Sequence, residues 1–198
     1  MCVVPRVSEQ HLAARRQQIL DAARRCFLRD GFHQTSMQDV IREAGLSVGA
    51  VYRYFPSKND LITAIAQAVV GTADENFADL STADPPLPLT GVLERALAFV
   101  DGQLGPDGVL PLALQVWSEA QRDPVLAEFV AATYTRLRGH FVTAARRARD
   151  AGELPPEADP DAVGAALFGL VPGYFTQRIL TGSPDRATYL TGARSLLR

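Results

Sequence analysis

Lysine and cysteine are scarce in this chain. The only lysine is Lys58, and the two cysteines, Cys2 and Cys26, lie far apart in the sequence. They provide neither a disulfide framework nor the ligand spacing of a metal site, so we predict no bound metal. Free thiols suit a reducing compartment. We therefore expect a cytoplasmic protein in which Cys26 is a small buried residue of a helix.

Long apolar runs and catalytic motifs are also missing. No hydrophobic run approaches the ~20 residues that span a bilayer, and the opening MCVVPRVSEQ is too short and too interrupted for a signal peptide. G-x-S-x-G, H-E-x-x-H, P-loop and C-x-x-C motifs do not occur, and the histidines are scattered singly along the chain. We predict no membrane segment, no catalytic residue, no cofactor and no enzymatic activity.

Charge is distributed unevenly along the chain, although the net charge is only −2. Residues 1–60 contain nine basic and six acidic side chains, whereas the remainder contains eleven basic and sixteen acidic ones. A basic N-terminal part attached to an acidic body favours a polyanionic partner for that part alone. The alternative is the ordinary solvated charge of helix surfaces.

Nearly every segment has helical periodicity, and no strand is convincing, so we predict an all-α fold. With 198 residues, 47% of them hydrophobic, the chain can bury the core of a small domain and of a larger one. Asn59 is the expected cap of the fourth helix. The predicted helices are 8–29, two short helices within 35–55, 60–80, 90–103, 109–121, 124–150, 160–180 and 185–197.

The stretch TSMQDVIREAGLSVGAVYRYFPSK, residues 35–58, has the pattern of two short helices joined by a tight turn. Thr35 and Gln38 form a predicted capping box, which starts the first helix. Gly45 permits the turn, and Ser47 caps the second helix. Two short helices joined in this way predict a helix-turn-helix unit.

Polar and small residues of this unit are candidates for DNA contacts. Free N–H groups at a helix N-terminus favour phosphate, which applies to Thr35 and Ser47. The first residues of the second helix would enter the major groove, where Val48 can meet a thymine methyl group. Gln38, Arg53 and Ser36 are the polar candidates for reading bases. The candidate DNA-binding residues are Thr35, Ser36, Ser47, Val48, Gly49, Tyr52, Tyr54 and Lys58.

The segment from Arg16 to Ile62 resembles the DNA-binding domain of the TetR (tetracycline repressor) family. The most specific run is GFHQTSMQDVIREAGLSVGAVYRYF followed by PSKNDLI. The resemblance implies an all-helical homodimer with a three-helix DNA-binding domain, residues 1–58, and a C-terminal domain for ligand binding and dimerisation, residues 59–198. It also implies that Val48 and Gly49 lie where family members read bases, and that other residues of the unit contact phosphates. The implied phosphate contacts are Thr35, Ser47, Tyr52, Tyr54 and Lys58.

The C-terminal domain contains candidates for two further sites. The run FGLVPGYFTQRIL, 168–180, resembles the penultimate helix of the family, which implies that 160–180 and 185–197 pair with their copies. The alternative for both sites is an ordinary internal core. The candidate interface residues are Ala162, Ala166, Phe168, Gly169 and Phe175. The candidate ligand-binding residues are Trp117, Phe129, Tyr134, Phe141, Tyr174 and Gln177.

Together these features predict a ligand-responsive transcriptional repressor. A small hydrophobic or amphipathic inducer would release the homodimer from a palindromic double-stranded DNA operator. The alternative is a helical protein-interaction module without small-molecule control.

Overall fold

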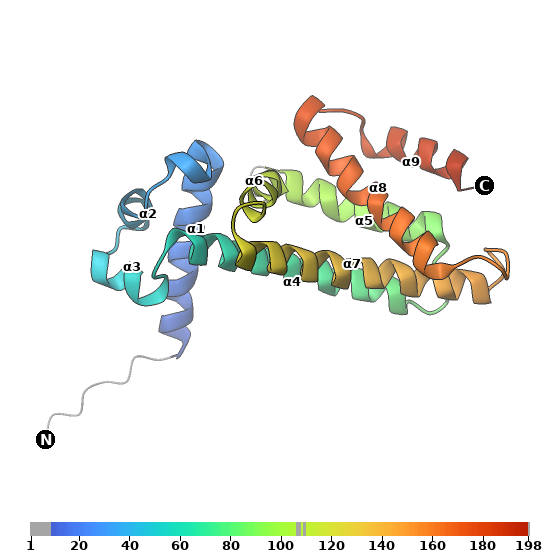
Figure 1. The fold of residues 1–198 in the computed structure, drawn as a ribbon, viewed down its shortest axis with the longest axis horizontal. Coiled ribbons are helices and arrows are strands. Elements are labelled where there is room, and N and C mark those ends of the chain that lie inside the picture. Colours follow the sequence, from blue (N-terminus) through green and yellow to red (C-terminus); the bar gives the residue numbers. More distant parts are fainter. Residues whose placement is uncertain (1–8, 106–107, 109, 198) are drawn as a thin grey trace, which may run out of the picture. The chain divides into compact units, whose positions relative to one another are not determined.

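The computed structural model describes residues 9–105, 108 and 110–197, and within them the chain forms nine helices and no strand (Figure 1). The predicted all-α fold class is therefore confirmed. None of these described helices is long and apolar enough to cross a membrane. Ser8, the predicted start of the first helix, and Cys2 lie outside the described residues.

The chain divides into two compact units, residues 1–68 and 69–198. The division falls inside one continuous helix, α4, which runs from Lys58 to Thr82. The boundary expected from the sequence, between residues 58 and 59, lies at the start of that helix instead. The helix that begins in the first unit thus also supplies side chains to the second.

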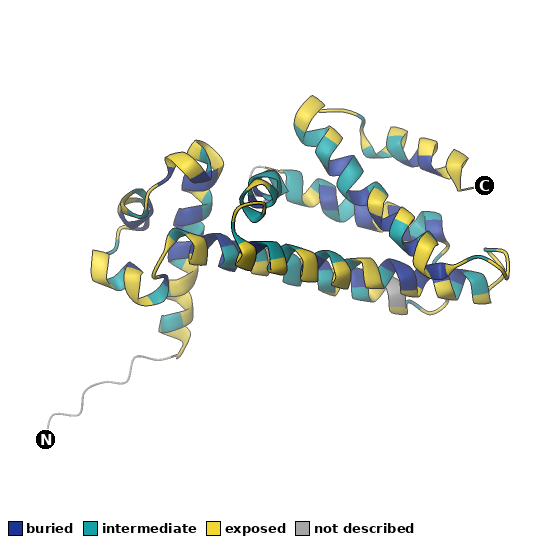
Figure 2. Ribbon diagram, viewed as in Figure 1, coloured by how far each residue is buried: buried dark blue, intermediate teal, exposed yellow. Residues whose placement is uncertain are grey.

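The first unit consists of α1 (Glu9–Gln34), α2 (Met37–Ala44), α3 (Val48–Tyr54) and the start of α4. The helical path of α1 breaks at Gly31, whose φ of 78° and ψ of 166° favour glycine. This break corresponds to the predicted helix end. Apolar residues from α1, α2, α3 and α4 are buried (Figure 2). They include Ile19, Leu20, Ala23, Phe27, Val40, Val51, Phe55, Leu61 and Ile62.

Two helices of this unit begin differently from the prediction. The capping box of α2 is formed by Ser36 and Asp39, not by Thr35 and Gln38. The start of α4 has the same arrangement: Ser57 N–H donates to Asp60 Oδ2 at 2.9 Å, and Asp60 N–H donates to Ser57 Oγ at 3.2 Å. The predicted cap residue Asn59 therefore lies inside the first turn. Both starts are serine followed three residues later by aspartate, a strong N-terminal signal.

The second unit contains the rest of α4 and five further helices. α7 and α8 make the most extensive contact, while α5 packs against α7, α8 and α9. Gly164 marks the closest approach, because a Cβ atom there would lie 2.6 Å from the Val142 Cα atom. The five helices are α5 (Leu89–Leu104), α6 (Leu110–Ala120), α7 (Pro124–Asp150), α8 (Pro160–Thr181) and α9 (Arg186–Leu196).

Aromatic rings form a continuous series through this unit. They come from α4, α5, α6, α7 and α8, so the series ties most of the unit together. Neighbouring rings are tilted or edge-on, which are the favourable geometries for aromatic pairs. Successive centroids lie 5.3 to 5.9 Å apart along Phe99, Phe77, Phe141, Phe168, Tyr134, Trp117 and Phe175.

Candidate nucleic-acid interface

The turn between α2 and α3 has the predicted helix-turn-helix geometry. Gly45 adopts the left-handed conformation, with φ 64° and ψ 29°, and its N–H donates to the Arg42 carbonyl oxygen at 3.2 Å. The Leu46 N–H donates to the Ile41 carbonyl oxygen at 3.4 Å. Ser47 then caps α3 by accepting a hydrogen bond from the Ala50 N–H. A residue with a Cβ atom would be strained at Gly45, so this glycine fixes the angle of the two helices.

α3 has one buried face and one exposed face (Figure 2). Val51 is fully buried and Phe55 is 3% exposed, and these two side chains anchor the helix in the unit. Val48 is 58% exposed and Tyr52 is 44% exposed. A seven-residue helix is marginal alone, so the buried face holds the exposed one in place. The guanidinium of Arg16, from α1, lies 5.2 Å above the Phe55 ring and adds a cation–π contact to this anchor.

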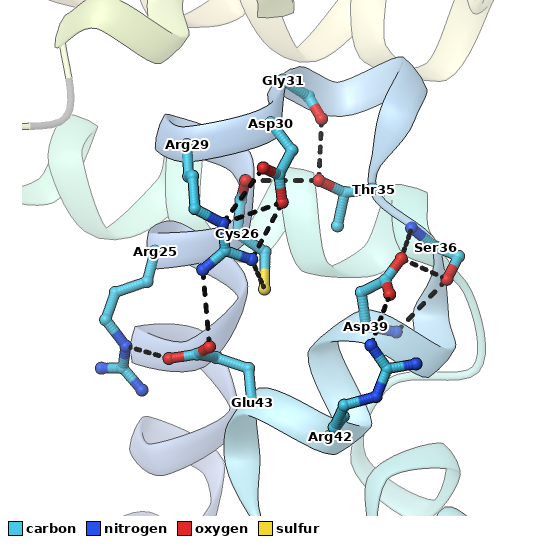
Figure 3. A network of polar contacts seen from close by, with 10 residues as sticks. All are labelled: Arg25, Cys26, Arg29, Asp30, Gly31, Thr35, Ser36, Asp39, Arg42 and Glu43. Carbon is cyan, nitrogen blue, oxygen red and sulfur yellow. Dashed lines mark hydrogen bonds and ion pairs between the residues drawn. The ribbon is translucent and has the colours of Figure 1, made fainter.

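Charged side chains join α1 to α2 (Figure 3). Arg25 Nε donates to Glu43 Oε1 at 2.7 Å, and the guanidinium of Arg29 lies 3.6 Å from Glu43 Oε2. Arg29 also pairs with Asp30 at 2.9 Å. The hydrogen bond from Arg25 is the main cause that lowers the pKa of Glu43. On the other side of the contact, Gln18 Nε2 donates to the Ala44 carbonyl oxygen at 2.8 Å. The orientation of α2, and through the turn that of α3, is thus set by polar contacts with α1.

Cys26 lies at the centre of this part of α1. The side chain is fully buried, as predicted, and burial raises the pKa of its thiol. A protonated buried thiol is a poor nucleophile. Cys26 therefore acts as a small apolar core residue.

Lys58 does not extend freely from the molecule. Its Nζ atom donates to the Phe32 carbonyl oxygen at 2.6 Å and to the Thr35 carbonyl oxygen at 3.2 Å, and its side chain is half-buried. The ammonium thereby satisfies carbonyl groups at the end of α1, where a cation is also favoured by the helix dipole. An ammonium has three donors. These two contacts leave one N–H for a further acceptor.

Two of the predicted hydroxyl contacts differ from expectation. Thr35 is 2% exposed, and its hydroxyl donates inward, to the Gly31 carbonyl oxygen at 2.8 Å (Figure 3). The Thr35 hydroxyl is therefore not directed at the surface, so this side chain does not supply the predicted phosphate contact. Ser36 is exposed, but its hydroxyl proton is directed at Asp39 Oδ2 at 2.6 Å. The hydrogen bonds that the Ser36 hydroxyl and N–H donate to Asp39 are the main cause that lowers the pKa of Asp39. Ser36 therefore shapes the start of α2.

The remaining candidates lie together on the surface of the first unit. Tyr54 is half-buried, and the others are exposed. Arg42 of α2 also has an exposed side chain, at 78%, and pairs with Asp39 at 3.3 Å. It was not among the predicted contacts, although its position in the last turn of an amphipathic helix was a usable signal. The exposed candidates are Ser47, Val48, Gly49 and Tyr52.

The candidate ligand residues of the second unit fall into three groups. Phe141 and Tyr174 are fully buried, and Tyr174 Oη donates to Asp101 Oδ1 at 2.6 Å. Burial raises the pKa of Tyr174 to about 12, as Asp101 also does. Gln177 is exposed, and its amide donates to the Gly173 carbonyl oxygen of its own helix, so its contact with a ligand stays a prediction. Half-buried side chains form the third group, which comprises Trp117, Phe129 and Tyr134.

The candidate interface residues lie on opposite faces of α8. Phe168 and Phe175 are buried among the aromatic rings of their own unit, so their assignment to a dimer interface is wrong. Residues seven apart share one helix face, which explains why these two point inward together. Ala162, Ala166 and Gly169 are exposed on α8.

Comparisons with known proteins agree with this architecture. Residues 19–65 match the family model "Bacterial regulatory proteins, tetR family", and residues 92–198 match "BetI-type transcriptional repressor, C-terminal". The HTH-type transcriptional repressor Rv1474c of Mycobacterium tuberculosis is 34% identical over 145 residues, which cover 68% of this chain and 71% of that protein. The HTH-type transcriptional regulator BetI of Escherichia coli is 27% identical over 195 residues, covering 95% of this chain and 94% of BetI.

Two solved structures are similar over most of their length. A transcriptional regulator from Saccharomonospora viridis in complex with choline has a TM-score of 0.75 and 24% identity, covering 93% of this chain and 96% of that one. SmeT of Stenotrophomonas maltophilia, in complex with triclosan, has a TM-score of 0.71 and 26% identity, covering 85% and 82%. The helix-turn-helix of the first unit and these matches over both units lead to one conclusion: the chain belongs to the TetR family of bacterial regulatory proteins and is a DNA-binding transcriptional repressor with a BetI-type C-terminal domain.

Proposed function

We propose that the first unit binds double-stranded DNA by placing the exposed face of α3 in the major groove. The observation that carries this proposal is the division of α3: Val51 is buried, as is Phe55 directly after the helix, while Val48 and Tyr52 are exposed. The hydroxyls of Ser47, Tyr52 and Tyr54 and the third N–H of Lys58 are the expected phosphate donors. The binding is tested by incubating the purified protein with fragments of the source genome at low salt. Failure to retain any fragment contradicts the proposal.

The same experiment separates this function from a protein-interaction module. Tyr52→Ala removes an exposed phosphate donor, and we expect it to weaken DNA binding while the helix content stays the same. Glu75→Gln, at an exposed position in the second unit, is the comparison that should leave the affinity for DNA unchanged. If Tyr52→Ala leaves DNA binding unchanged, the assignment of this face is wrong.

The second unit is proposed to bind a small hydrophobic or amphipathic molecule beside Trp117 and Tyr134, two half-buried neighbours in the aromatic series. These two rings are partly accessible, as is that of Phe129 on α7, whereas Phe141 lies fully inside. Choline in the S. viridis structure and triclosan in the SmeT structure are a quaternary ammonium and a chlorinated phenol. Aromatic faces attract both, the first through cation–π contacts and the second through apolar stacking.

Trp117 is the only tryptophan of the chain, so its fluorescence reports directly on the proposed ligand position. We expect a saturable change in its emission with one of the two ligand classes, together with a rise in melting temperature. The same ligand should lower the affinity for DNA. Unchanged emission and unchanged melting temperature with both classes would contradict the proposed ligand chemistry.

A homodimer is proposed to form through the exposed small residues of α8. Ala162, Ala166 and Gly169 follow a helical spacing that leaves room for a second helix to approach closely, and Leu180 on the same helix is 70% exposed. Two copies related by a twofold axis would read a palindromic operator, with half-sites about one helical turn, roughly 34 Å, apart.

The inducer would then release DNA by favouring dimers whose α3 helices do not match that spacing. We further propose that the protein acts in the cytoplasm, where its operator and its inducer meet.

A further inference from the structure

The exposed face of α3 offers few hydrogen-bonding groups to a base. Val48 and Gly49, which open the helix, carry none, and Tyr52 carries a single hydroxyl. Arg53 lies in the last turn of α3, whereas the residues expected to enter the major groove are those of its first turn. In the major groove the thymine 5-methyl group is the feature that an apolar side chain recognises. A face of this composition can therefore obtain specificity from methyl contacts where it cannot obtain it from hydrogen bonds.

We propose that Val48 recognises the 5-methyl group of a thymine in each operator half-site, and that Gly49 allows the backbone of α3 to approach the base closely enough for this contact. The inference rests on the proposed docking of α3 in the major groove and specifies how that docking selects a sequence.

Val48 has the properties that such a contact requires. It is 58% exposed, so its methyl groups are not used for the core of its own unit. Its branched side chain is restricted at χ1, so little rotamer freedom is lost when it meets a partner. Burial of one methyl group against another in place of water corresponds to about a threefold to fivefold gain in affinity.

Gly49 has no explanation inside the chain. A Cβ atom built there meets no atom within 4 Å, and the backbone has no positive φ. Glycine in a helix is less favourable than alanine, and α3 has only seven residues. Neither packing nor conformation requires a glycine at this position. The space that the missing side chain leaves is, in this proposal, occupied by the base.

The test begins with a duplex recovered by selecting genomic fragments that the protein binds. Each thymine is then replaced in turn by deoxyuridine, which lacks only the 5-methyl group. We expect one thymine in each half-site to lower the affinity about threefold to fivefold when replaced. Val48→Ala should cause a similar loss with the thymine duplex and no further loss with the uracil duplex. Because Val48 is exposed, this variant keeps its core intact.

Gly49→Ala provides an independent measurement. We expect the alanine to raise the melting temperature and yet to weaken DNA binding at least tenfold, since its methyl group would occupy the space of the base. Gly139→Ala is the matched control, because Gly139 is also an exposed helical glycine whose Cβ would meet nothing within 4 Å. This control should gain stability and bind DNA normally.

The outcomes distinguish the inference from the function on which it rests. If no thymine is sensitive, if Val48→Ala loses as much affinity with uracil as with thymine, or if Gly49→Ala binds normally, methyl recognition by this face is wrong while DNA binding stands. If the protein retains no DNA at all, the proposed docking of α3 fails and the inference fails with it.

Discussion

Lys58 Nζ lies 2.6 Å from the Phe32 carbonyl oxygen, so the only lysine of the chain closes the end of α1 from the first turn of α4. The same ammonium lies 3.2 Å from the Thr35 carbonyl oxygen, immediately before α2. One side chain thus links the helix that precedes the helix-turn-helix to the helix that follows it. This position gives the residue a structural role beside its proposed contact with phosphate.

Replacement of Lys58 by alanine is expected to affect both stability and DNA binding. Two carbonyl oxygens lose a charged donor, which costs about 1–3 kcal/mol of unfolding free energy. If the third N–H binds a phosphate, the dependence of log affinity on log salt should decrease by about one unit. Thermal denaturation and titrations at several salt concentrations measure the two effects.

Lys58→Gln separates the two roles. Its amide can still donate to a backbone carbonyl, so part of the stability should return, while the salt dependence should stay reduced because the charge is missing. A salt dependence equal to that of the unmodified protein would show that Lys58 contributes only to the structure.

Acid should weaken both the contact of α1 with α2 and the N-terminal cap of α2. Hydrogen bonds from Arg25 lower the pKa of Glu43, and those of Ser36 lower the pKa of Asp39. A carboxylate whose pKa is lower in the folded state binds fewer protons there than in the unfolded chain. Its stabilisation is therefore complete above the unfolded pKa, about 4, and is lost as the pH falls through the folded pKa.

Glu43→Gln should flatten this acid dependence. We expect its melting temperature to be lower than that of the unmodified protein at pH 7 and the difference to shrink as the pH falls below about 4. Glu75→Gln, at an exposed position in the second unit, is the control that should keep the original profile. A constant difference between Glu43→Gln and the unmodified protein from pH 7 to pH 3 would contradict the assigned role of the Glu43 charge.

Gly164 is expected to tolerate no side chain. An added Cβ atom would lie 2.6 Å from both the Cα and the N atom of Val142, and backbone atoms cannot move aside as a flexible side chain can. Gly164→Ala should lower the unfolding free energy by about 1–3 kcal/mol. Gly102→Ala, where the new Cβ would meet nothing within 4 Å, should leave it equal or slightly higher. Equal melting temperatures for the two variants would mean that α7 and α8 are not in such close contact.

The helix boundaries were predictable where strong local signals agree. α7 begins at Pro124, as predicted, because Asp123 accepts hydrogen bonds from Val125 and Leu126 and proline suits the first helical position. At α2, both Thr35 and Ser36 are acceptable caps. Only the burial of the Thr35 side chain, which is decided by the rest of the unit, selects the serine.

The two faces of α8 were not predictable for a related reason. Apolar residues occur around the whole helix, so periodicity does not separate the face that covers α7 from the face that is free. Phe168 and Ala166 illustrate this: they are two residues apart, and one is buried while the other is exposed. Which helix packs against each face of α8 depends on the fold of the whole unit and not on the local sequence. The inward position of the Lys58 ammonium depends on the fold in the same way.

Ala166 provides the sharpest test of the proposed dimer. Because it is exposed on α8, Ala166→Arg should fold normally while placing a long charged side chain where the partner helix would approach. We expect this variant to elute as a monomer and to bind the palindromic operator at least tenfold more weakly, because the two half-sites would no longer be bound by one particle. Ala132→Arg, on the exposed surface of α7, is the matched control and should remain dimeric. Phe168→Ala should instead lower the melting temperature, since its ring packs on Phe141 and Tyr134 inside the unit. A dimeric Ala166→Arg variant would place the interface elsewhere on the second unit.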